Sequence, residues 1–195
     1  ILGGLYLAID ATAGERERHS LEPLLATPVP REALIYGKIL ASASFMLLSL
    51  ALTVITCAVA LRFVDLENFG MTARLDAGVV AGIVLATAPL APAAAGLMTV
   101  VASFTRSYRE AQSYLGFAMM LPTLPLAFIS ILGLKPSLPL MAVPSLSQHF
   151  LMTSLLRDEP LGPLNLLLSA GVSLALGAAL AWLAGRLYER ESILG

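Results

Sequence analysis

Long apolar runs without charged side chains dominate the pattern of this chain, and short charged stretches separate them. A helix needs about 20 consecutive apolar residues to cross the hydrocarbon core of a bilayer. Residues 1–12 are apolar but shorter than this, so we interpret them as the end of a span that begins outside the sequence. Four longer runs predict full spans over 34–62, 78–103, 111–134 and 161–186. The pattern predicts one domain over 1–195, an all-α, polytopic transmembrane helix bundle.

A further stretch, 136–157, is uncharged up to Arg157 and differs from the four spans because prolines and polar residues interrupt it. It contains Pro139, Pro144, Gln148 and His149. Proline breaks the backbone hydrogen bonding of a helix, and an unpaired backbone group at membrane depth has to be sheltered by protein. We therefore expect 136–157 to be a re-entrant or interfacial segment.

Small residues in the last predicted span indicate how it packs. They recur every four positions and so share one helix face: Ser169, Ser173, Gly177, Ala181 and Gly185. Such a stripe lets two helix backbones approach closely in lipid. We expect another span to lie against it.

The composition agrees with a membrane protein. Of the 195 residues, 57% are hydrophobic and 13% charged, and the mean hydropathy is +0.83, whereas about 25% of the residues in a soluble domain are charged. The net charge of −1 provides no basic field for binding nucleic acid. The composition argues against a soluble enzyme or a nucleic-acid-binding protein, and it makes the lipid bilayer the expected surroundings.

The basic residues predict the orientation, because cytoplasmic loops carry more Lys and Arg. Alternation of the spans places 13–38, 103–110 and 186–195 on one side. That side holds eight basic residues: Arg16, Arg18, Arg31, Lys38, Arg106, Arg109, Arg186 and Arg190. The other side holds four: Arg62, Arg74, Lys135 and Arg157. The first side, including the C-terminus, is therefore expected in the cytoplasm of a multi-pass protein of the inner (cytoplasmic) membrane.

The cytoplasmic segment 13–33 is predicted to contain a short helix. Ser20 is a suitable N-cap, and Thr27 before a proline is driven toward extended geometry, so the helix covers about two turns. Leu21, Leu24 and Leu25 share one side of it. Acidic residues outnumber basic ones around these leucines, which disfavours an anionic lipid surface and favours a groove on a protein partner.

The stretch Glu15-Arg-Glu-Arg-His-Ser-Leu-Glu-Pro-Leu-Leu-Ala-Thr-Pro-Val-Pro-Arg-Glu32, followed by Gly37-Lys38, resembles the signature of bacterial ABC export permeases of the second type. It is most similar to their sodium-efflux, NatB-like branch. This family usually has Gly-Thr where the chain has His19-Ser20, and Ser20 keeps the capping hydroxyl. The layout of the spans also fits the transmembrane permease domain of this family.

The resemblance implies that 13–33 is a coupling segment that docks on a separate ABC ATP-binding subunit. The expected docking residues are Glu15, Arg16, Glu17, Arg18, Ser20, Leu21, Glu22, Leu24 and Leu25. It also implies efflux of a substrate, with sodium suggested, by an assembly with a second permease copy or a sister permease. The absence of charged residues inside the spans is compatible instead with a hydrophobic compound.

The chain has no glycine-rich phosphate loop ending in Gly-Lys-Ser/Thr. We therefore expect it to be a transport subunit and not an enzyme, with no cofactor of its own. ATP and Mg²⁺ would act through the partner subunit. His19 and His149 are predicted on opposite sides of the membrane, so no metal site is expected.

Polar and proline positions in the two central spans are candidates for the substrate path: Thr53, Thr56, Thr87, Thr99, Pro89 and Pro92. Serine and threonine in helices usually donate to their own backbone instead. Two other functions stay open at this point. One is a stand-alone channel or secondary carrier, and the other is a structural membrane-assembly protein that recruits a partner other than an ATPase.

Overall fold

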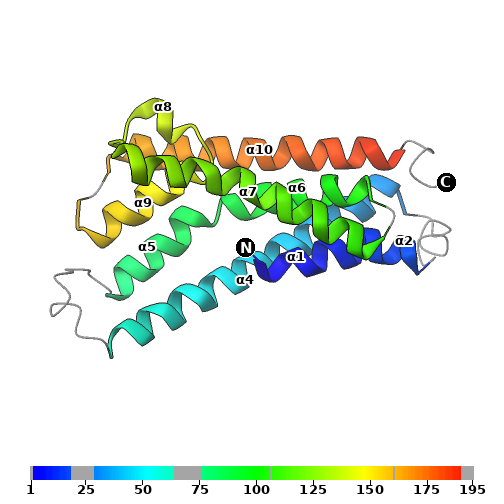
Figure 1. Cartoon of the computed structure of the whole chain (residues 1–195), viewed down its shortest axis with the longest axis horizontal. Coiled ribbons are helices and arrows are strands. Elements are labelled where there is room, and N and C mark those ends of the chain that lie inside the picture. Colours follow the sequence, from blue (N-terminus) through cyan, green and yellow to red (C-terminus); the bar gives the residue numbers. More distant parts are fainter. Residues whose placement is uncertain (1, 19–28, 64–75, 106, 160, 190–195) are drawn as a thin grey trace.

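The computed structural model describes residues 2–18, 29–63, 76–105, 107–159 and 161–189. Within these ranges all regular elements are helical (Figure 1). In chain order they are α1 Leu2–Ile9, the π-helix η1 Asp10–Gly14, α2 Glu15–Glu17, α4 Arg31–Leu61, α5 Ala77–Thr87, α6 Leu90–Ser103, α7 Tyr108–Leu132, α8 Leu138–Met141, α9 Leu146–Leu156 and α10 Pro163–Glu189.

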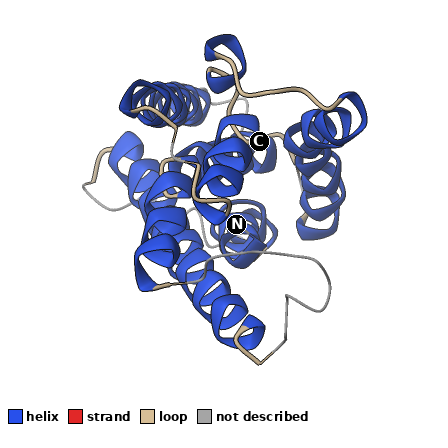
Figure 2. Cartoon of the chain, turned by 90° about the vertical axis from the view of Figure 1, so that its left-hand side faces the viewer, coloured by secondary structure: helices blue, strands red, loops and turns tan. Residues whose placement is uncertain are grey.

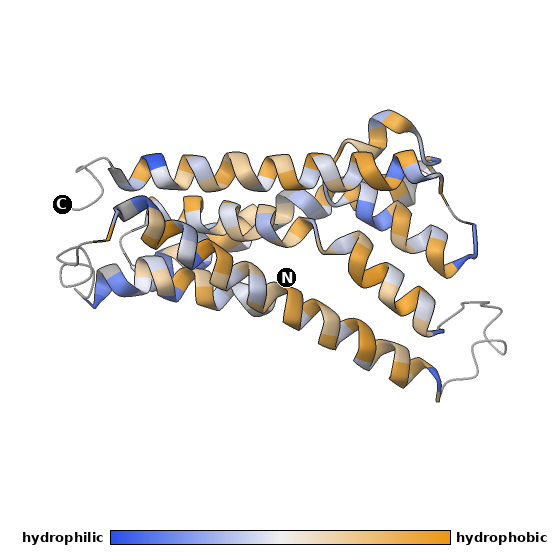
Figure 3. Ribbon diagram, turned by 180° about the vertical axis from the view of Figure 1, so that it is seen from behind, coloured by the Kyte–Doolittle hydropathy of each residue, from blue (hydrophilic) through white to orange (hydrophobic). Residues whose placement is uncertain are grey.

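Four stretches of the described chain are long and apolar enough to cross a membrane: Glu32–Leu61, Ala77–Ser103, Tyr108–Ile129 and Pro163–Tyr188. Large apolar side chains on these helices are exposed, including Leu40, Phe117 and Leu167. Figure 3 shows apolar residues along the helices and hydrophilic ones mainly near their ends. The predicted all-α membrane helix bundle is confirmed, and the protein is a multi-pass membrane protein.

The helices run between two ends of the bundle (Figure 1). At the α2 end lie α2, the start of α4, the start of α7 and the end of α10. At the α9 end lie the end of α4, the start of α5, and α8 with α9. Figure 2 views the bundle from the α9 end, so several helices are seen nearly end-on. The charged segments thus alternate between the ends in the order that the sequence predicts.

Two glycines allow α6 and α10 to pack closely against each other. A Cβ atom on Gly177 would lie 2.9 Å from the backbone nitrogen of Ala93, and one on Gly96 would lie 2.9 Å from the Cβ of Leu180. Both distances are shorter than van der Waals contact, so only glycine fits at either position. The predicted close approach along the small-residue stripe of α10 is confirmed, and the partner is α6.

Prolines affect two of the membrane-spanning stretches differently. The span Ala77–Ser103 is split into α5 and α6 at Ala88 and Pro89, whereas α7 continues through Pro122 and Pro125. A proline cannot donate the hydrogen bond of an α-helix, so each one removes a backbone bond from its helix.

The segment predicted to be re-entrant or interfacial, 136–157, is folded as the two short helices α8 and α9. The α9 helix packs against α5, α7 and α10. It begins at Ser145, which has a φ of 73°, a conformation that side-chain-bearing residues rarely adopt. From there α9 runs outward to Arg157 at the α9 end (Figure 1).

Candidate functional site

The predicted docking segment is described at its beginning. Glu15, Arg16 and Glu17 form α2, and Arg18 follows directly, at the α2 end of the bundle. The backbone stays helical from α1 through η1 into α2, so these charged residues extend the first helix. The other expected docking residues lie outside the described residues: Ser20, Leu21, Glu22, Leu24 and Leu25.

The π-helix η1 leaves the backbone carbonyl of Ala11 available to accept a hydrogen bond from Lys38 of α4. In an α-helix the Glu15 N–H would donate to the carbonyl of Ala11, but here it donates to the carbonyls of Asp10 and Thr12. The ammonium of Lys38 donates to the Ala11 carbonyl oxygen over 2.7 Å. The irregular turn therefore presents an acceptor to a cation on the neighbouring helix.

The same ammonium forms an ion pair with the carboxylate of Glu15. The side chains of Lys38 and Glu15 are only 13% and 24% exposed, so water screens this pair less than a surface pair. Glu15 was expected to contact a partner protein; in the structure it binds Lys38 of α4. Lys38 belongs to the signature noted in the sequence but was not among the expected docking residues; its position as a lone cation at the boundary of an apolar run was the available signal.

A second ion pair lies along the first helix and depends on Gly14. Arg18 and Asp10 are 2.9 Å apart, and about half of each side chain is exposed. A Cβ on Gly14 would lie 2.8 Å from the Asp10 Oδ1 atom, so a side chain there would displace the Asp10 carboxylate. Exposed pairs contribute little stability, about 0–1 kcal/mol. This pair mainly orients the Arg18 guanidinium next to α2.

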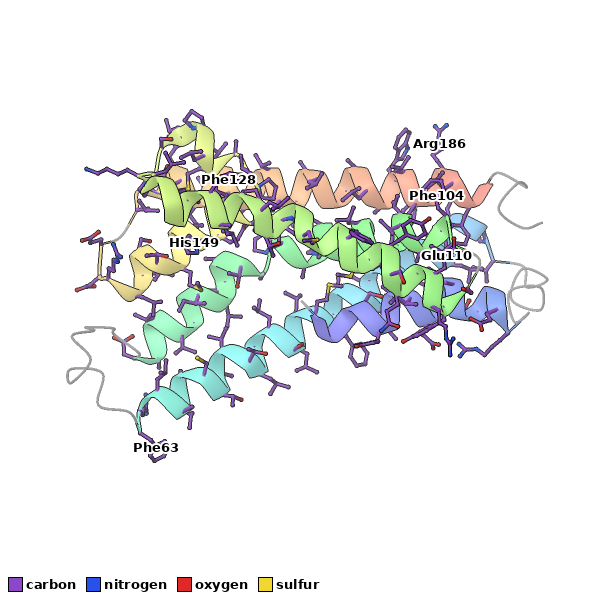
Figure 4. All side chains as sticks on the ribbon, viewed as in Figure 1. Phe63, Phe104, Glu110, Phe128, His149 and Arg186 are labelled. Carbon is purple, nitrogen blue, oxygen red and sulfur yellow. The ribbon has the colours of Figure 1, made fainter. Side chains whose placement is uncertain are left out.

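Glu17 connects α2 to α7. Its Oε2 atom accepts a hydrogen bond of 2.8 Å from the backbone N–H of Tyr108, the first residue of α7. The first N–H groups of a helix lack partners within the helix, and a carboxylate is favoured beside them. Figure 4 shows Glu110 in the same first turn of α7 at the α2 end. The charged segment is thus attached to two helices, α4 through Glu15 and α7 through Glu17.

We predict that Glu17→Ala loosens the first turn of α7. A favourable charge at a helix N-terminus contributes about 0.3–1 kcal/mol, so amide exchange at 108–111 should accelerate up to about fivefold. Hydrogen exchange followed by mass spectrometry measures this effect. Glu32→Ala, an exposed acid in the first turn of α4, is the matched control and should leave α7 unchanged. Equal exchange in the two variants would contradict the link.

The candidate substrate-path residues do not share one environment. Thr53 and Thr56 are exposed on α4, whereas Thr99 is buried in α6. Thr53, Thr87 and Thr99 each donate to the carbonyl four residues earlier in their own helix. Pro89 lies at the break between α5 and α6, and Pro92 packs against Gly177. The structure gives these residues local roles in their helices and does not bring them together.

A second polar cluster, the Gln148 network, joins α9 to α10. It consists of Ser145, Ser147, Gln148, Ser169 and Ser173. The Gln148 Nε2 atom donates to the Ser173 Oγ atom over 2.7 Å. The Ser169 hydroxyl donates to that of Ser147, which donates in turn to the Gln148 Oε1 atom. Four of the five residues are at most 3% exposed: Ser147, Gln148, Ser169 and Ser173.

The network also reaches the start of α9 and the neighbouring α7. The Ser145 N–H donates to the Gln148 Oε1 atom, and the Ser145 hydroxyl donates to the Pro122 carbonyl of α7, both over 2.7 Å. In the sequence, Gln148 indicates a broken span, and Ser169 and Ser173 indicate a small-residue packing face. Their hydrogen bonds could not be predicted, because no pattern in the sequence places 145–148 against the last span.

Two of three comparisons with known proteins gave a match. The model of the ABC-2 family transporter proteins matches residues 2–187. The ABC transporter permease protein NatB of Bacillus subtilis (strain 168) is 31% identical in an alignment of 166 residues that covers 80% of this chain. The chain spans 41% of the length of that relative. No solved structure matches the chain.

These matches agree with the charged signature at 15–38 and with the all-α bundle of apolar helices. The resemblance to NatB-like ABC permeases, noted from the sequence, is confirmed by the family model and by the curated relative. The chain belongs to the ABC-2 family of transporter proteins.

Proposed function

We propose that the chain is part of the membrane-spanning permease subunit of an ATP-driven ABC exporter. A separate ATP-binding subunit would bind ATP and Mg²⁺ and dock on the cytoplasmic segment 13–33. The observation that carries this proposal is the attachment of α2 to both α4 and α7, through Lys38 and Tyr108. Family membership supports it.

The proposed mechanism is mechanical transmission. When the ATPase moves the docking segment, the Glu15–Lys38 ion pair would transfer that motion to α4, and the Glu17 carboxylate would transfer it to α7. Both helices are long and continuous, so a displacement at the α2 end changes their positions deep in the bundle. The leucines at 21, 24 and 25 would supply the docking contact, while the charged residues set its register.

The proposed substrate is sodium, which family resemblance suggests, or a hydrophobic compound, which the distribution of charge suggests. The described spans carry their charged residues near the ends, such as Lys38 in α4, Glu110 in α7 and Arg186 in α10. A stepwise ion relay would place ionisable groups inside the spans. This distribution favours the hydrophobic compound.

The proposed setting is the inner membrane, with the α2 end and the C-terminus in the cytoplasm. Segment 136–157 would then be re-entrant or interfacial on the outer side. The bundle would pair with a second permease copy or a sister permease.

The test is co-purification in detergent of the full-length permease with its candidate ATPase. The variant Leu24→Glu/Leu25→Glu should lose the ATPase, because two carboxylates cannot enter an apolar groove. A matched control, Leu134→Glu/Leu138→Glu, makes the same two changes at exposed positions at the α9 end and should retain it. Equal membrane insertion of all three proteins is established first.

Each outcome distinguishes the candidate functions. Loss of the ATPase in the docking variant alone supports the permease. Equal retention in both variants would reject the leucines as the docking contact. Absence of the ATPase from the wild-type preparation would favour a stand-alone channel or carrier, or an assembly protein without an ATPase.

A further inference from the structure

The turn η1 holds one residue more than a regular helical turn. The Glu15 N–H reaches the Asp10 carbonyl, five residues back, whereas an α-helical bond spans four residues. Each residue of an α-helix adds a rotation of about 100°. The extra residue in η1 therefore changes the rotation of α2, and with it the direction in which the charged start of the docking segment 13–33 faces.

An ion pair in the same helix agrees with this change of rotation. Asp10 begins η1 and Arg18 follows α2, and their side chains are 2.9 Å apart. In a regular α-helix two residues eight positions apart point about 80° away from each other. With one extra residue in η1 the pair corresponds to seven regular steps, which leaves an angle of only about 20°. The π form therefore brings Asp10 and Arg18 to the same side of the helix.

Lys38 of α4 supplies the bond that the π form requires. The Ala11 carbonyl does not receive the Glu15 N–H in this form, and the Lys38 ammonium donates to it over 2.7 Å. A part-buried carbonyl that lacks its donor costs free energy. Without the ammonium, the α form would be favoured, because it returns the Glu15 N–H to Ala11. The same ammonium also pairs with the Glu15 carboxylate, so it holds the turn at two points.

We propose that Lys38 sets the rotation of the docking segment by holding η1 in the π form. In this form the Glu17 carboxylate meets the backbone N–H of Tyr108. In the α form every residue after η1 advances by one position, so Arg16 takes the place of Glu17. This inference rests on the proposed function, because it treats 13–33 as the surface that binds the ATPase. Lys38 is a positioning residue, which acts on that surface through η1.

Crosslinking to position 108 measures the rotation. The background is full-length permease without cysteines, with Cys57 replaced by serine. One protein carries Glu17→Cys with Tyr108→Cys, a second carries Arg16→Cys with Tyr108→Cys, and a short bifunctional thiol reagent joins each pair. In the parent, position 17 should react faster, because Glu17 already contacts the start of α7. Lys38→Met should reverse this preference, changing the ratio of the two rates about tenfold or more, as loss of a hydrogen bond from a charged donor does.

The matched control makes the same substitution at another lysine. Lys135 is exposed at the α9 end, far from η1 (Figure 1). Lys135→Met should therefore keep the parental preference for position 17. An equal change of preference in Lys135→Met and Lys38→Met would overturn the proposal.

Deletion of Ala11 separates rotation from the loss of an ion pair. Removing one residue from η1 in Lys38→Met offsets the extra step, so the α form then places Glu17 beside Tyr108 again. Crosslinking should return to position 17, although the ammonium is still missing. If Lys38→Met alone inserts poorly, the deletion variant decides the question, because without Ala11 the ammonium is no longer needed. Failure of the deletion to restore position 17, or poor insertion of the deletion variant, would overturn the proposal.

Co-purification of the ATPase relates this rotation to docking. Lys38→Met keeps every expected docking residue, yet it should lose most of the ATPase, and deletion of Ala11 in this variant should restore it. Full retention of the ATPase by Lys38→Met would overturn the positioning role. Crosslinking is measured without the ATPase, so the two proposals fail separately. If no ATPase binds the parent, the proposed function fails, and an unchanged preference in Lys38→Met shows that Lys38 does not set the rotation.

Discussion

Gly177→Leu should prevent stable packing of the bundle. The position has no room, since even a Cβ would lie 2.9 Å from the Ala93 nitrogen and 3.1 Å from the Pro92 carbonyl carbon. Backbone atoms cannot move aside as a flexible side chain does, so α6 and α10 would have to separate. Overpacking of this kind costs about 3 kcal/mol or more, which corresponds to a fall in Tm of roughly 6–12 °C for a chain of this size.

The matched control lies on the same helix. Gly171 of α10 has open space around its Cβ position, with nothing within 4 Å. Gly171→Leu adds the same side chain, so it should keep the Tm of the parent within a few degrees. Thermal unfolding in detergent, followed by size-exclusion chromatography, compares the two. Similar losses in both variants would show that the cost comes from the change of residue and not from the α6–α10 contact.

Lys38→Met should destabilise the attachment of α2 to α4. The change removes the ammonium and leaves the Glu15 carboxylate and the Ala11 carbonyl without this donor. Because both side chains keep some exposure, we expect a loss of about 1–2 kcal/mol, less than for a fully buried pair. The measurement is the Tm in detergent, which should fall by roughly 2–8 °C.

A double-mutant cycle separates the ion pair from other effects of the substitution. Glu15→Gln removes the charge that Lys38→Met leaves unpaired, so the double variant should lose less than the two single variants together. Lys135→Met is the matched control, because Lys135 is exposed at the α9 end. Additive losses in the cycle would mean that Glu15 and Lys38 do not stabilise each other.

Much of the fold could be predicted from one-dimensional patterns. Apolar runs without charge predicted helices that correspond to α4, to α5 with α6, to α7 and to α10. This works because lipid requires every backbone group to be paired within its own segment. The stripe at Gly177 predicted a close helix contact for a similar local reason, but it could not name α6 as the partner.

The candidate site was predicted less completely. The charged residues Glu15 and Glu17 were singled out for docking, yet the structure shows that both bind other helices of the chain. Tyr108 follows Glu17 by 91 positions, and its contribution is a backbone N–H, which no residue pattern reveals. Lys38 meets a carbonyl that exists as a free acceptor only because η1 departs from α-helical bonding.

The sequence by itself determined that this is an all-α membrane protein of the ABC-2 family, because composition, hydrophobic run length and the signature at 15–38 are local properties of the chain. Only the tertiary structure decided that α2 is attached to α4 and α7, and that Gln148 bonds to Ser173. These contacts depend on which helices lie side by side and on how they are rotated. The packing of the whole bundle determines the neighbours of each helix and its rotation, so neither can be deduced from a single segment of the sequence.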